Sequence, residues 1–271
     1  MRIMRIAVTV LFILTSIVFC ATFLFQKGKE DNTVPVITIE TDFIEVKCAA
    51  TNKDLLKGVT ATDEKDGDLT DEVIVESVSR FIEPGVCVVK YAVCDSNNHV
   101  ARATRKVKYT DYEAPKFKLK NSLCFSLYEN ANISSYISAI DSIDGDISEN
   151  IVITSPDYSS SVTGIFTLEL TVSNQKGDTS TLSLPLIMED RNLSAPTIKL
   201  KDYLIYVDKD QKIDFEKYLI EATNRNGGDL TDKVEIDDNV NLKKSGTYMV
   251  HYFVTDSTGA KGHSVLNVVV N

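Results

Sequence analysis

Three long segments alternate between apolar and polar residues, and each opens on a glycine. They read GVCVVKYAVCD from Gly85, GIFTLELTVSN from Gly164 and GTYMVHYFVTD from Gly246. A period of two puts every second side chain on the same face of a strand. When the glycines are aligned, one face is apolar in all three segments: Val89, Tyr91 and Val93; Leu168, Leu170 and Val172; Val250, Tyr252 and Val254. We predict that this face lies in the core and that the alternate positions, Lys90, Glu169 and His251, face outward.

Shorter apolar runs with the same period surround each long segment. Around the first segment they lie at 37–48 and 73–78, and a partner strand at 101–109 follows a polar turn at 95–98. Two long strands joined by a short polar turn predict a β-hairpin. The same order recurs twice more, except at 214–224, which we interpret as an irregular crossover able to form a helical turn or two.

A turn motif repeats in step with these strands. It reads TDEKDGDLT at 62–70, IDSIDGDIS at 140–148 and, in altered form, TNRNGGDLT at 223–231. Glycine tolerates positive φ, and flanking Asp or Asn side chains hydrogen-bond the local backbone, so the motif predicts a fixed turn between extended segments. Pro35, Pro115 and Pro196 are 80 and 81 residues apart, which indicates a true repeat.

The repeat divides the chain after its first 33 residues. We predict domains at 34–112, 113–192 and 193–271, with short junctions near 113–116 and 191–196 that end in Ala-Pro. Many short strands with turn signals and no strong helix predict an all-β fold of three tandem immunoglobulin-like β-sandwiches. Gly246 and Tyr248 open a late strand as a tyrosine corner does, whereas Cys87 and Phe166 replace that tyrosine in the other repeats.

The N-terminal segment predicts location. Residues 6–25 carry no charge, and a helix of that length spans about 30 Å of hydrocarbon. We favour a retained signal anchor with a cytoplasmic N-terminus behind Arg2 and Arg5, and a short stalk up to residue 33. A cleaved signal peptide, with secretion of the repeats, and a lipoprotein modified at Cys20 are the alternatives. In the favoured topology the protein is a single-pass cell-membrane protein with extracellular repeats.

Charge narrows the classes of partner. The chain has 39 acidic and 29 basic residues and a net charge of −10, which repels phosphate backbones and disfavours nucleic-acid binding. Each repeat is small, so we expect a modest core that is helped by its neighbours.

The combined motifs resemble a known family. The order is Pro near the start of a repeat, Ala-x-Asp-x-x-Asp-Gly-Asp-Leu/Ile-Thr/Ser in its middle, and Gly-x-Tyr-x-Val-x-Tyr-x-Val-x-Asp before a final hairpin. It resembles the bacterial Ig-like domains named from repeats in a pesticidal crystal protein, over about residues 34–271. The resemblance is strongest in repeat one and departs in repeat three, where Asn224 and Gly227 replace two aspartates. It implies tandem domains on the bacterial surface, with a display or adhesion role and no particular chemistry.

The acidic turns are the first candidate for chemistry. Two sets of aspartates offer oxygen ligands for calcium: Asp63, Asp66 and Asp68 in repeat one, and Asp141, Asp144 and Asp146 in repeat two. The turns lack the 12-residue calcium loop that ends in Glu, so we favour a structural role, with calcium as the lesser reading. Asp111 and Asp190, before the Ala-Pro junctions, resemble the acids of cadherin linkers, again as the lesser reading.

Catalysis has little support in the sequence. The three histidines, His99, His251 and His263, lie in turns or strands without a motif nucleophile, and we expect them to be solvated. No phosphate loop or metal-spaced histidine cluster appears, and no cofactor is predicted. Acidic pairs for glycoside hydrolysis depend on spatial separation, which the sequence leaves open. We therefore expect a protein that is not an enzyme.

Four cysteines lie beyond the apolar segment. Strand parity puts Cys48 and Cys87 on core-facing positions of repeat one, where a disulfide could join the two sheets, and puts Cys94 and Cys124 on outward positions. Reduced thiols are an equal alternative, because the compartment decides whether disulfides persist.

Together these patterns predict a membrane-anchored extracellular array. We expect residues 6–25 to hold it in the membrane and the repeats to act in adhesion, by binding protein or glycan at the cell surface. A passive stalk or spacer is the main alternative, and a membrane-tethered enzyme is less favoured.

Overall fold

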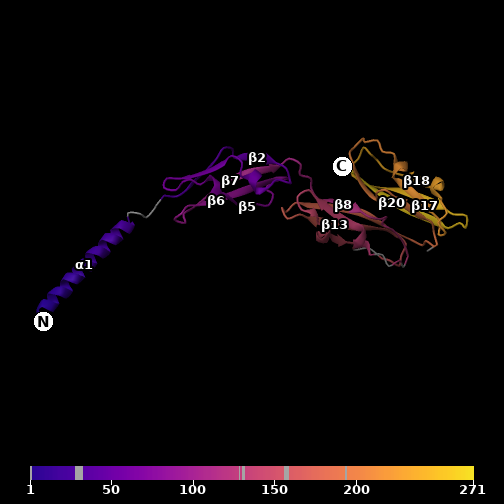
Figure 1. Cartoon of the computed structure of the whole chain (residues 1–271). Helices are drawn as coiled ribbons and strands as arrows, with labels where there is room; N and C mark the ends of the chain where they lie inside the picture. Colours follow the sequence, from indigo (N-terminus) through magenta and orange to yellow (C-terminus); the bar gives the residue numbers. More distant parts are fainter. Residues whose placement is uncertain (1, 28–32, 128, 130–131, 156–158, 193) are drawn as a thin grey trace. The chain divides into compact units, whose positions relative to one another are not determined.

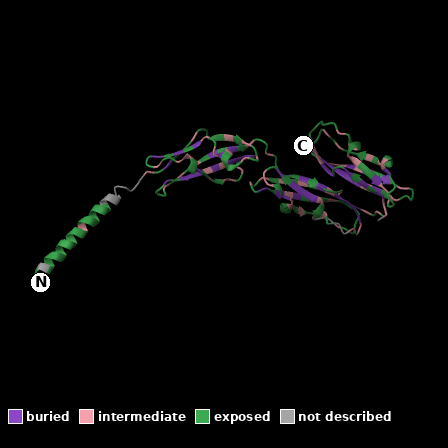
Figure 2. Cartoon of the chain, viewed as in Figure 1, coloured by how far each residue is buried: buried purple, intermediate pink, exposed green. Residues whose placement is uncertain are grey.

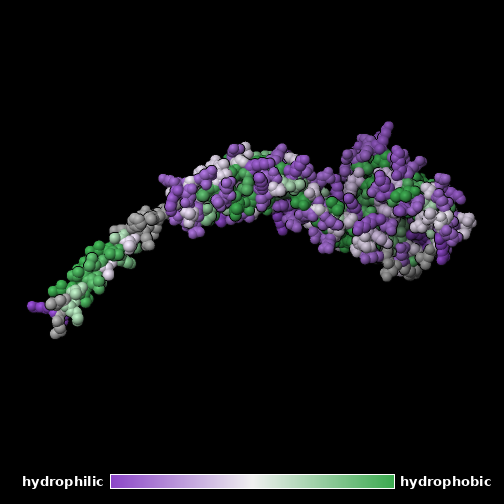
Figure 3. Space-filling view, viewed as in Figure 1, coloured by the Kyte–Doolittle hydropathy of each residue, from purple (hydrophilic) through white to green (hydrophobic). Residues whose placement is uncertain are grey.

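The computed structural model describes residues 2–27, 33–127, 129, 132–155, 159–192 and 194–271 (Figure 1). The chain begins with the helix α1 (Arg2–Lys27), and most of the described elements after it are strands. Within α1, residues Met4–Phe23 are long and apolar enough to cross a membrane, by length and composition. This part of α1 is exposed (Figure 2) and forms a hydrophobic surface (Figure 3). The predicted N-terminal apolar helix is confirmed.

Repeat one forms a three-stranded sheet in the order β1-β3-β4 and a four-stranded sheet in the order β2-β7-β6-β5. Its described elements are β1 (Val36–Ile39), β2 (Phe43–Val46), α2 (Asn52–Leu55), β3 (Val59–Asp63), β4 (Gly67–Asp68), the 3₁₀ helix η1 (Thr70–Glu72), β5 (Ile74–Val78), β6 (Val86–Cys94) and β7 (Val100–Tyr109).

Repeat two has the same plan, with sheets in the orders β11-β10-β8 and β12-β13-β14-β9. Its described elements are β8 (Lys116–Leu119), β9 (Cys124–Ser126), η2 (Ile133–Tyr136), β10 (Ile137–Asp141), β11 (Gly145–Asp146), η3 (Ser148–Asn150), β12 (Val152–Thr154), β13 (Gly164–Ser173) and β14 (Thr179–Glu189). The short strand β9 runs parallel to β14, with Cys124 opposite Ile187, whereas β8 pairs antiparallel with β10 in the other sheet.

Repeat three has a two-stranded sheet, β15-β17, and a four-stranded sheet in the order β16-β20-β19-β18. Its described elements are β15 (Thr197–Leu200), β16 (Leu204–Val207), η4 (Phe215–Tyr218), β17 (Leu219–Thr223), η5 (Thr231–Lys233), β18 (Glu235–Asp238), β19 (Gly246–Thr255) and β20 (Lys261–Val270). The segment interpreted as a crossover thus forms one 3₁₀ turn and then a strand. Each repeat consists of two sheets of short strands, which confirms the all-β, immunoglobulin-like prediction.

The long hairpins supply the cores, as the alternation predicts. The nine core positions named from the three aligned segments are all at most 2% exposed. Tyr91 and Tyr252 are fully buried, and their hydroxyls donate to the carbonyls of Leu55 and Phe215 at 2.6 Å and 2.8 Å. A buried tyrosine hydroxyl usually has a hydrogen-bond partner. Each of these tyrosines therefore links the long hairpin of its own repeat to the helical turn that contains the accepting carbonyl.

Repeat three also contains the predicted tyrosine corner. The hydroxyl of Tyr248 donates to the carbonyl of Lys244 at 2.9 Å. This bond joins the start of β19 to the chain just before it, in the way expected of immunoglobulin-like folds.

The described chain groups into two compact units. The first holds most of repeat one; the second holds residues 47–49, 80–86 and 109–271, so repeats two and three share one unit. Within this second unit, Cys124, Ile187 and Val265 form a small apolar cluster packed by Met249. The backbone N–H of Val265 donates to the hydroxyl of Ser122 at 3.0 Å. The outward faces of the β14 and β20 sheets are therefore in contact, and the predicted boundary at 192/193 lies inside this unit.

Candidate functional site

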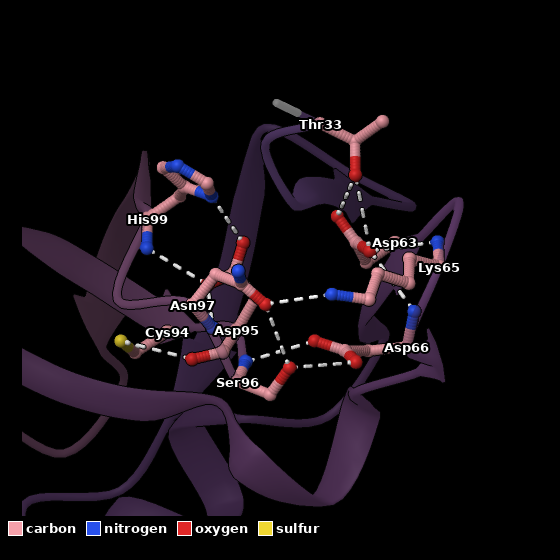
Figure 4. A network of polar contacts seen from close by, with 9 residues as sticks. All are labelled: Thr33, Asp63, Lys65, Asp66, Cys94, Asp95, Ser96, Asn97 and His99. Atoms are coloured by element: carbon pink, nitrogen blue, oxygen red, sulfur yellow. Dashed lines mark hydrogen bonds and ion pairs between the residues drawn. The ribbon is translucent and has the colours of Figure 1, made fainter. Parts of the chain in front are cut away.

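The acidic turn of repeat one is held by its own backbone (Figure 4). Asp63 Oδ1 accepts from the N–H groups of Lys65 at 2.9 Å and Asp66 at 3.0 Å. Asp66 Oδ2 accepts from the N–H of Ser96 at 2.8 Å, and the Ser96 hydroxyl donates to Asp66 Oδ1. These contacts fasten the acidic turn to the turn between β6 and β7, which is the structural role predicted from the motif.

Repeat two reproduces this arrangement, and repeat three keeps part of it. In repeat two, Asp141 Oδ1 accepts from two backbone N–H groups of its turn, and Asp144 Oδ2 accepts from the N–H of Gln175 at 2.7 Å. In repeat three, Asn224 Oδ1 accepts from the N–H groups of Asn226 and Gly228 at 3.0 Å and 2.8 Å. An amide oxygen thus holds the turn of repeat three, with a second donor four residues later in place of the donor three residues later in the other repeats.

A further aspartate closes each turn, and we call Asp68, Asp146 and Asp229 the third-position aspartates. Each accepts from the backbone N–H of the Thr or Ser two residues later. Hydrogen bonds from that residue's hydroxyl and N–H hold the pKa of each third-position aspartate below its ordinary value.

The carboxylates of these turns do not converge on one point. A metal site needs several ligand atoms close together. Among the described residues, one group of three His, Cys, Asp or Glu side chains has its ligand atoms within 4.8 Å of one another, and it lies in the second unit and not in these turns. Asp111 accepts from the backbone N–H of Cys48 at 2.7 Å, and Asp190 is exposed. Calcium at the turns or junctions stays a prediction to which the geometry adds no support.

The converging group consists of Cys124, Glu189 and His263. Cys124 begins β9, Glu189 ends β14, and His263 lies near the start of β20. His263 Nδ1 lies 3.3 Å from Cys124 Sγ and also contacts Glu189 Oε1. The His263 side chain is only 7% exposed, so the prediction of a solvated histidine is wrong at this position.

Two aromatic rings set the orientation of His263. Its Nε2 lies 2.9 Å from Nδ1 of His251, and its ring stacks on Phe253 with centroids 4.3 Å apart. His251 stacks on the same phenylalanine. His251 and His263 therefore act as one layer on the outward face of the last hairpin.

Burial controls the charges of this cluster. Burial, and then the negative charge of Glu189, raises the pKa of Cys124 to about 12, so the thiol is neutral. Burial alone would raise the pKa of Glu189, but hydrogen bonding and charge from His263 hold it below the ordinary value. Burial and the charge of His263 lower the pKa of His251. The cluster thus holds an ionised carboxylate beside a neutral thiol.

Arg191 links the two repeats beside the cluster. Its guanidinium donates to the carbonyl of His263 at 2.8 Å and to the carbonyl of Cys124 at 3.3 Å. Cys124, Arg191 and His263 line a cavity of about 350 Å³. Glu189 lines a second cavity of about 560 Å³, and Arg191 and His263 line that cavity as well. Water can therefore reach the cluster from both cavities.

The geometry does not match a nucleophilic triad. In a triad the acid and the nucleophile bond to opposite nitrogens of the histidine, whereas Glu189 and Cys124 both face Nδ1 of His263. A thiol whose pKa is raised is also a poor nucleophile. The same three atom types, sulfur, imidazole nitrogen and carboxylate oxygen, are instead the ligands that proteins use for zinc.

The sequence analysis missed this site because its members are far apart and because the outward position predicted for Cys124 gave no sign that another repeat covers it. Cys124 is 139 residues from His263, and it is buried because repeat three covers the outward face of β9. One signal was present in the sequence. Two of the three histidines lie on the outward face of one hairpin, and paired outward histidines can mark a polar cluster.

No disulfide joins Cys48 to Cys87 in this structure, where all five cysteines are in the reduced form. Cys87 is buried in β6, as parity predicts, but β2 ends at Val46 and Cys48 lies in the turn that follows. The alternation that put Cys48 on the core face therefore stops before it.

Comparison with known proteins finds a family match within the third repeat. Residues 205–270 match the family described as bacterial surface protein, Ig-like domain. The chain is 25% identical over 244 residues to the pesticidal crystal protein Cry22Aa of Bacillus thuringiensis, which covers 86% of this chain and 33% of that protein. Residues 205–270 therefore resemble a bacterial surface Ig-like domain, and the family resemblance is confirmed. The matched family segment lies in repeat three, although repeat one keeps more of the acidic motif.

Two other similarities support less, because one covers a smaller part of this chain and the other has a low TM-score. An uncharacterized 81.3 kDa protein of Acholeplasma phage L2 is 32% identical over 137 residues, 49% of this chain and 18% of that protein. The chain thus spans a third or less of the length of either relative. A solved structure of Drosophila N-cadherin EC1-3 covers 90% of both chains at 11% identity, with a TM-score of 0.33 that is too low to support an inference.

Proposed function

We propose that this protein is a membrane-tethered module of the bacterial surface that binds a protein or glycan partner outside the cell and performs no catalysis. The family match to a bacterial surface Ig-like domain supports the surface location. The apolar helix α1 supports tethering, because Met4–Phe23 has the length and composition of a membrane span. The repeats would then be displayed on the outer side.

One observation favours binding over passive spacing, namely the cavity of about 350 Å³ in the second unit. Amide and charged groups line it, including Asn121, Asn192 and Arg191, together with the ring of Tyr136. Ser264 also lines it, and this 2% exposed side chain has a hydroxyl without a hydrogen-bond partner among the described residues. Buried polar groups are normally paired, so the cavity suits a ligand rich in hydroxyl or amide groups.

A passive stalk is the second candidate. Repeats two and three share one compact unit, and the N–H of Phe117 in repeat two donates to the hydroxyl of Tyr206 in repeat three at 3.2 Å. A joint of this kind resists bending and would serve a spacer equally well. The two functions differ in whether the cavity contributes to attachment.

The test is binding of the full-length protein, reconstituted in lipid vesicles, to purified cell-wall polysaccharide and to bacterial cells, with and without calcium. Asn121→Trp would place a large ring in the cavity mouth, and Asn150→Trp, on an exposed position of the same repeat outside the cavity lining, is the matched control. We expect saturable binding that Asn121→Trp weakens and Asn150→Trp leaves intact. Failure of the parent protein to bind any surface would favour the stalk.

The tether and the absence of catalysis have separate tests. The mass of the protein recovered from membranes distinguishes a retained anchor from a cleaved signal peptide. Release of the repeats as a shortened soluble chain would contradict the anchor. Turnover of a glycan or peptide by the purified protein would contradict the non-enzymatic proposal.

A further inference from the structure

We propose that Cys124, Glu189 and His263 bind one zinc ion, which clamps repeat two to repeat three. Repeat two supplies the thiol and the carboxylate, and repeat three supplies the imidazole. The three ligand atoms come within 4.8 Å of one another in the second unit. This inference goes beyond the proposed partner binding, because it concerns what joins two repeats, although Cys124 and His263 also line the cavity of about 350 Å³.

The spacing of Cys124 Sγ and His263 Nδ1 fits a tetrahedral ion, whereas Glu189 Oε1 lies closer to Nδ1 than such a site allows and would have to move outward. With Zn–S near 2.3 Å and Zn–N near 2.0–2.1 Å, the ligand atoms of such a site stand roughly 3.3–3.6 Å apart. Cys124 Sγ and His263 Nδ1 are 3.3 Å apart, and Glu189 Oε1 contacts the same nitrogen. An ion entering between them would replace the direct contacts of His263 and would require only small movements of the side-chain tips.

The imidazole is already oriented for this role. A histidine that binds metal through one nitrogen usually has a hydrogen-bonding partner on the other. His263 directs Nδ1 at Cys124 and Glu189, and its Nε2 lies 2.9 Å from Nδ1 of His251. Stacking on Phe253 fixes the plane of the ring. These contacts reduce the conformational freedom that metal binding would otherwise remove.

Arg191 would not compete for the ligand atoms. Its guanidinium donates to the carbonyl oxygens of His263 and Cys124, so the sulfur and the ring nitrogen stay available. Cys124 would lose its proton when the metal binds, and its thiolate together with the Glu189 carboxylate would then balance the charge of a divalent ion. The cavities on either side leave room for water as the fourth ligand, as in sites with three protein ligands.

The donor set selects the class of metal. Calcium and magnesium take oxygen ligands, whereas a thiolate with an imidazole favours zinc and related transition metals. The acidic turns offer only oxygen and are already occupied by protein N–H groups. The cluster is thus chemically distinct from the calcium candidates.

Zinc binding can be measured on the full-length protein in detergent, kept reduced and first stripped with a chelator. Titration against a chromophoric zinc indicator should show one equivalent bound, and Co²⁺ should give a thiolate-to-metal charge-transfer band with tetrahedral visible bands. Cys124→Ser and Glu189→Gln should abolish or strongly weaken this binding. Cys94→Ser, which removes an exposed thiol in repeat one, is the matched control and should leave it unchanged.

His251→Phe tests the orienting contact, because it keeps a ring beside Phe253 while removing the nitrogen that meets His263. We expect roughly 10- to 100-fold weaker zinc affinity with the same stoichiometry. Hydrogen–deuterium exchange reports the clamp, and zinc should slow exchange in both β9 and β20 of the parent protein but not of Cys124→Ser. Exchange in β10 and β17, which lie in the other sheet of repeat two and repeat three, checks that each variant is folded.

Three results would overturn the proposal. They are absence of a stoichiometric zinc ion, an unchanged cobalt–thiolate band in Cys124→Ser, and bound zinc that leaves exchange in β9 and β20 unaltered. The first two reject the site, and the third rejects the clamp.

Discussion

Replacing Asp63 by alanine removes the acceptor that two backbone N–H groups of the repeat-one turn share. Asp63 is 7% exposed, and its Oδ1 accepts from Lys65 and Asp66 at 2.9 Å and 3.0 Å. A net contribution of about 1 kcal/mol for each hydrogen bond gives a loss of about 2 kcal/mol for Asp63→Ala. Water can hydrogen-bond to the freed N–H groups of this turn. The value of about 1 kcal/mol is therefore the middle of the range of net contributions that neutral hydrogen bonds make to the free energy of unfolding.

Asp63→Asn should cost less than half as much. An amide oxygen can accept two backbone N–H groups, as Asn224 does in repeat three from the residues two and four positions later. The amide nitrogen of the variant would face the hydroxyl of Thr33, which lies 3.3 Å from Oδ2 of Asp63 and can accept a hydrogen bond. The pair of variants therefore separates the oxygen acceptor from the negative charge.

Hydrogen–deuterium exchange of the full-length protein measures this locally. A loss of 2 kcal/mol corresponds to roughly 30-fold faster exchange through opening of repeat one, read in β3 and β6. Equal acceleration by Asp63→Asn and Asp63→Ala would refute the hydrogen-bond reasoning and indicate that the charge itself is needed. Slower exchange of the parent protein on addition of calcium would favour a cation at this turn.

Three further outcomes are expected from the same protein. Tyr248→Phe removes the bond to the carbonyl of Lys244 and should destabilise repeat three by about 1 kcal/mol, seen as faster exchange in β19; no change would mean that the corner bond adds nothing. Gly262→Ala should cost about 1–3 kcal/mol, because an added Cβ would lie 2.3 Å from the carbonyl oxygen of Pro196, whereas the exposed neighbour Lys261→Ala should cost under about 0.5 kcal/mol in the same exchange measurement. The third-position aspartates have folded-state pKa values below the ordinary 3.8, so their contribution to stability is present above pH 3.8 and is lost as the pH falls below it. Tyrosine circular dichroism from pH 7 downward should stay constant to about pH 4, and a loss of the turns near neutral pH would contradict this.

Local signals allowed much of the fold to be predicted from the sequence. The Asp-Gly turn requires only residues within a few positions of one another, as the contacts of Asp63 with Lys65 and Asp66 show. Strand alternation is equally local, and it identified the buried faces of all three long hairpins. Its limit is the end of a strand, which is why parity misplaced Cys48 just beyond β2.

Only the tertiary structure brought the candidate metal ligands together. Glu189 and His263 are 74 residues apart, and Cys124 and His263 are 139 apart, so no local spacing relates them. Alternation assigns a residue to the face of its own sheet, but it cannot say whether a second sheet covers that face. Cys124 is outward in β9 and still buried, because the outward face of repeat three packs against it. The sequence determines which side chains point away from the core of each repeat. The packing of one repeat on the next decides which of these side chains come into contact.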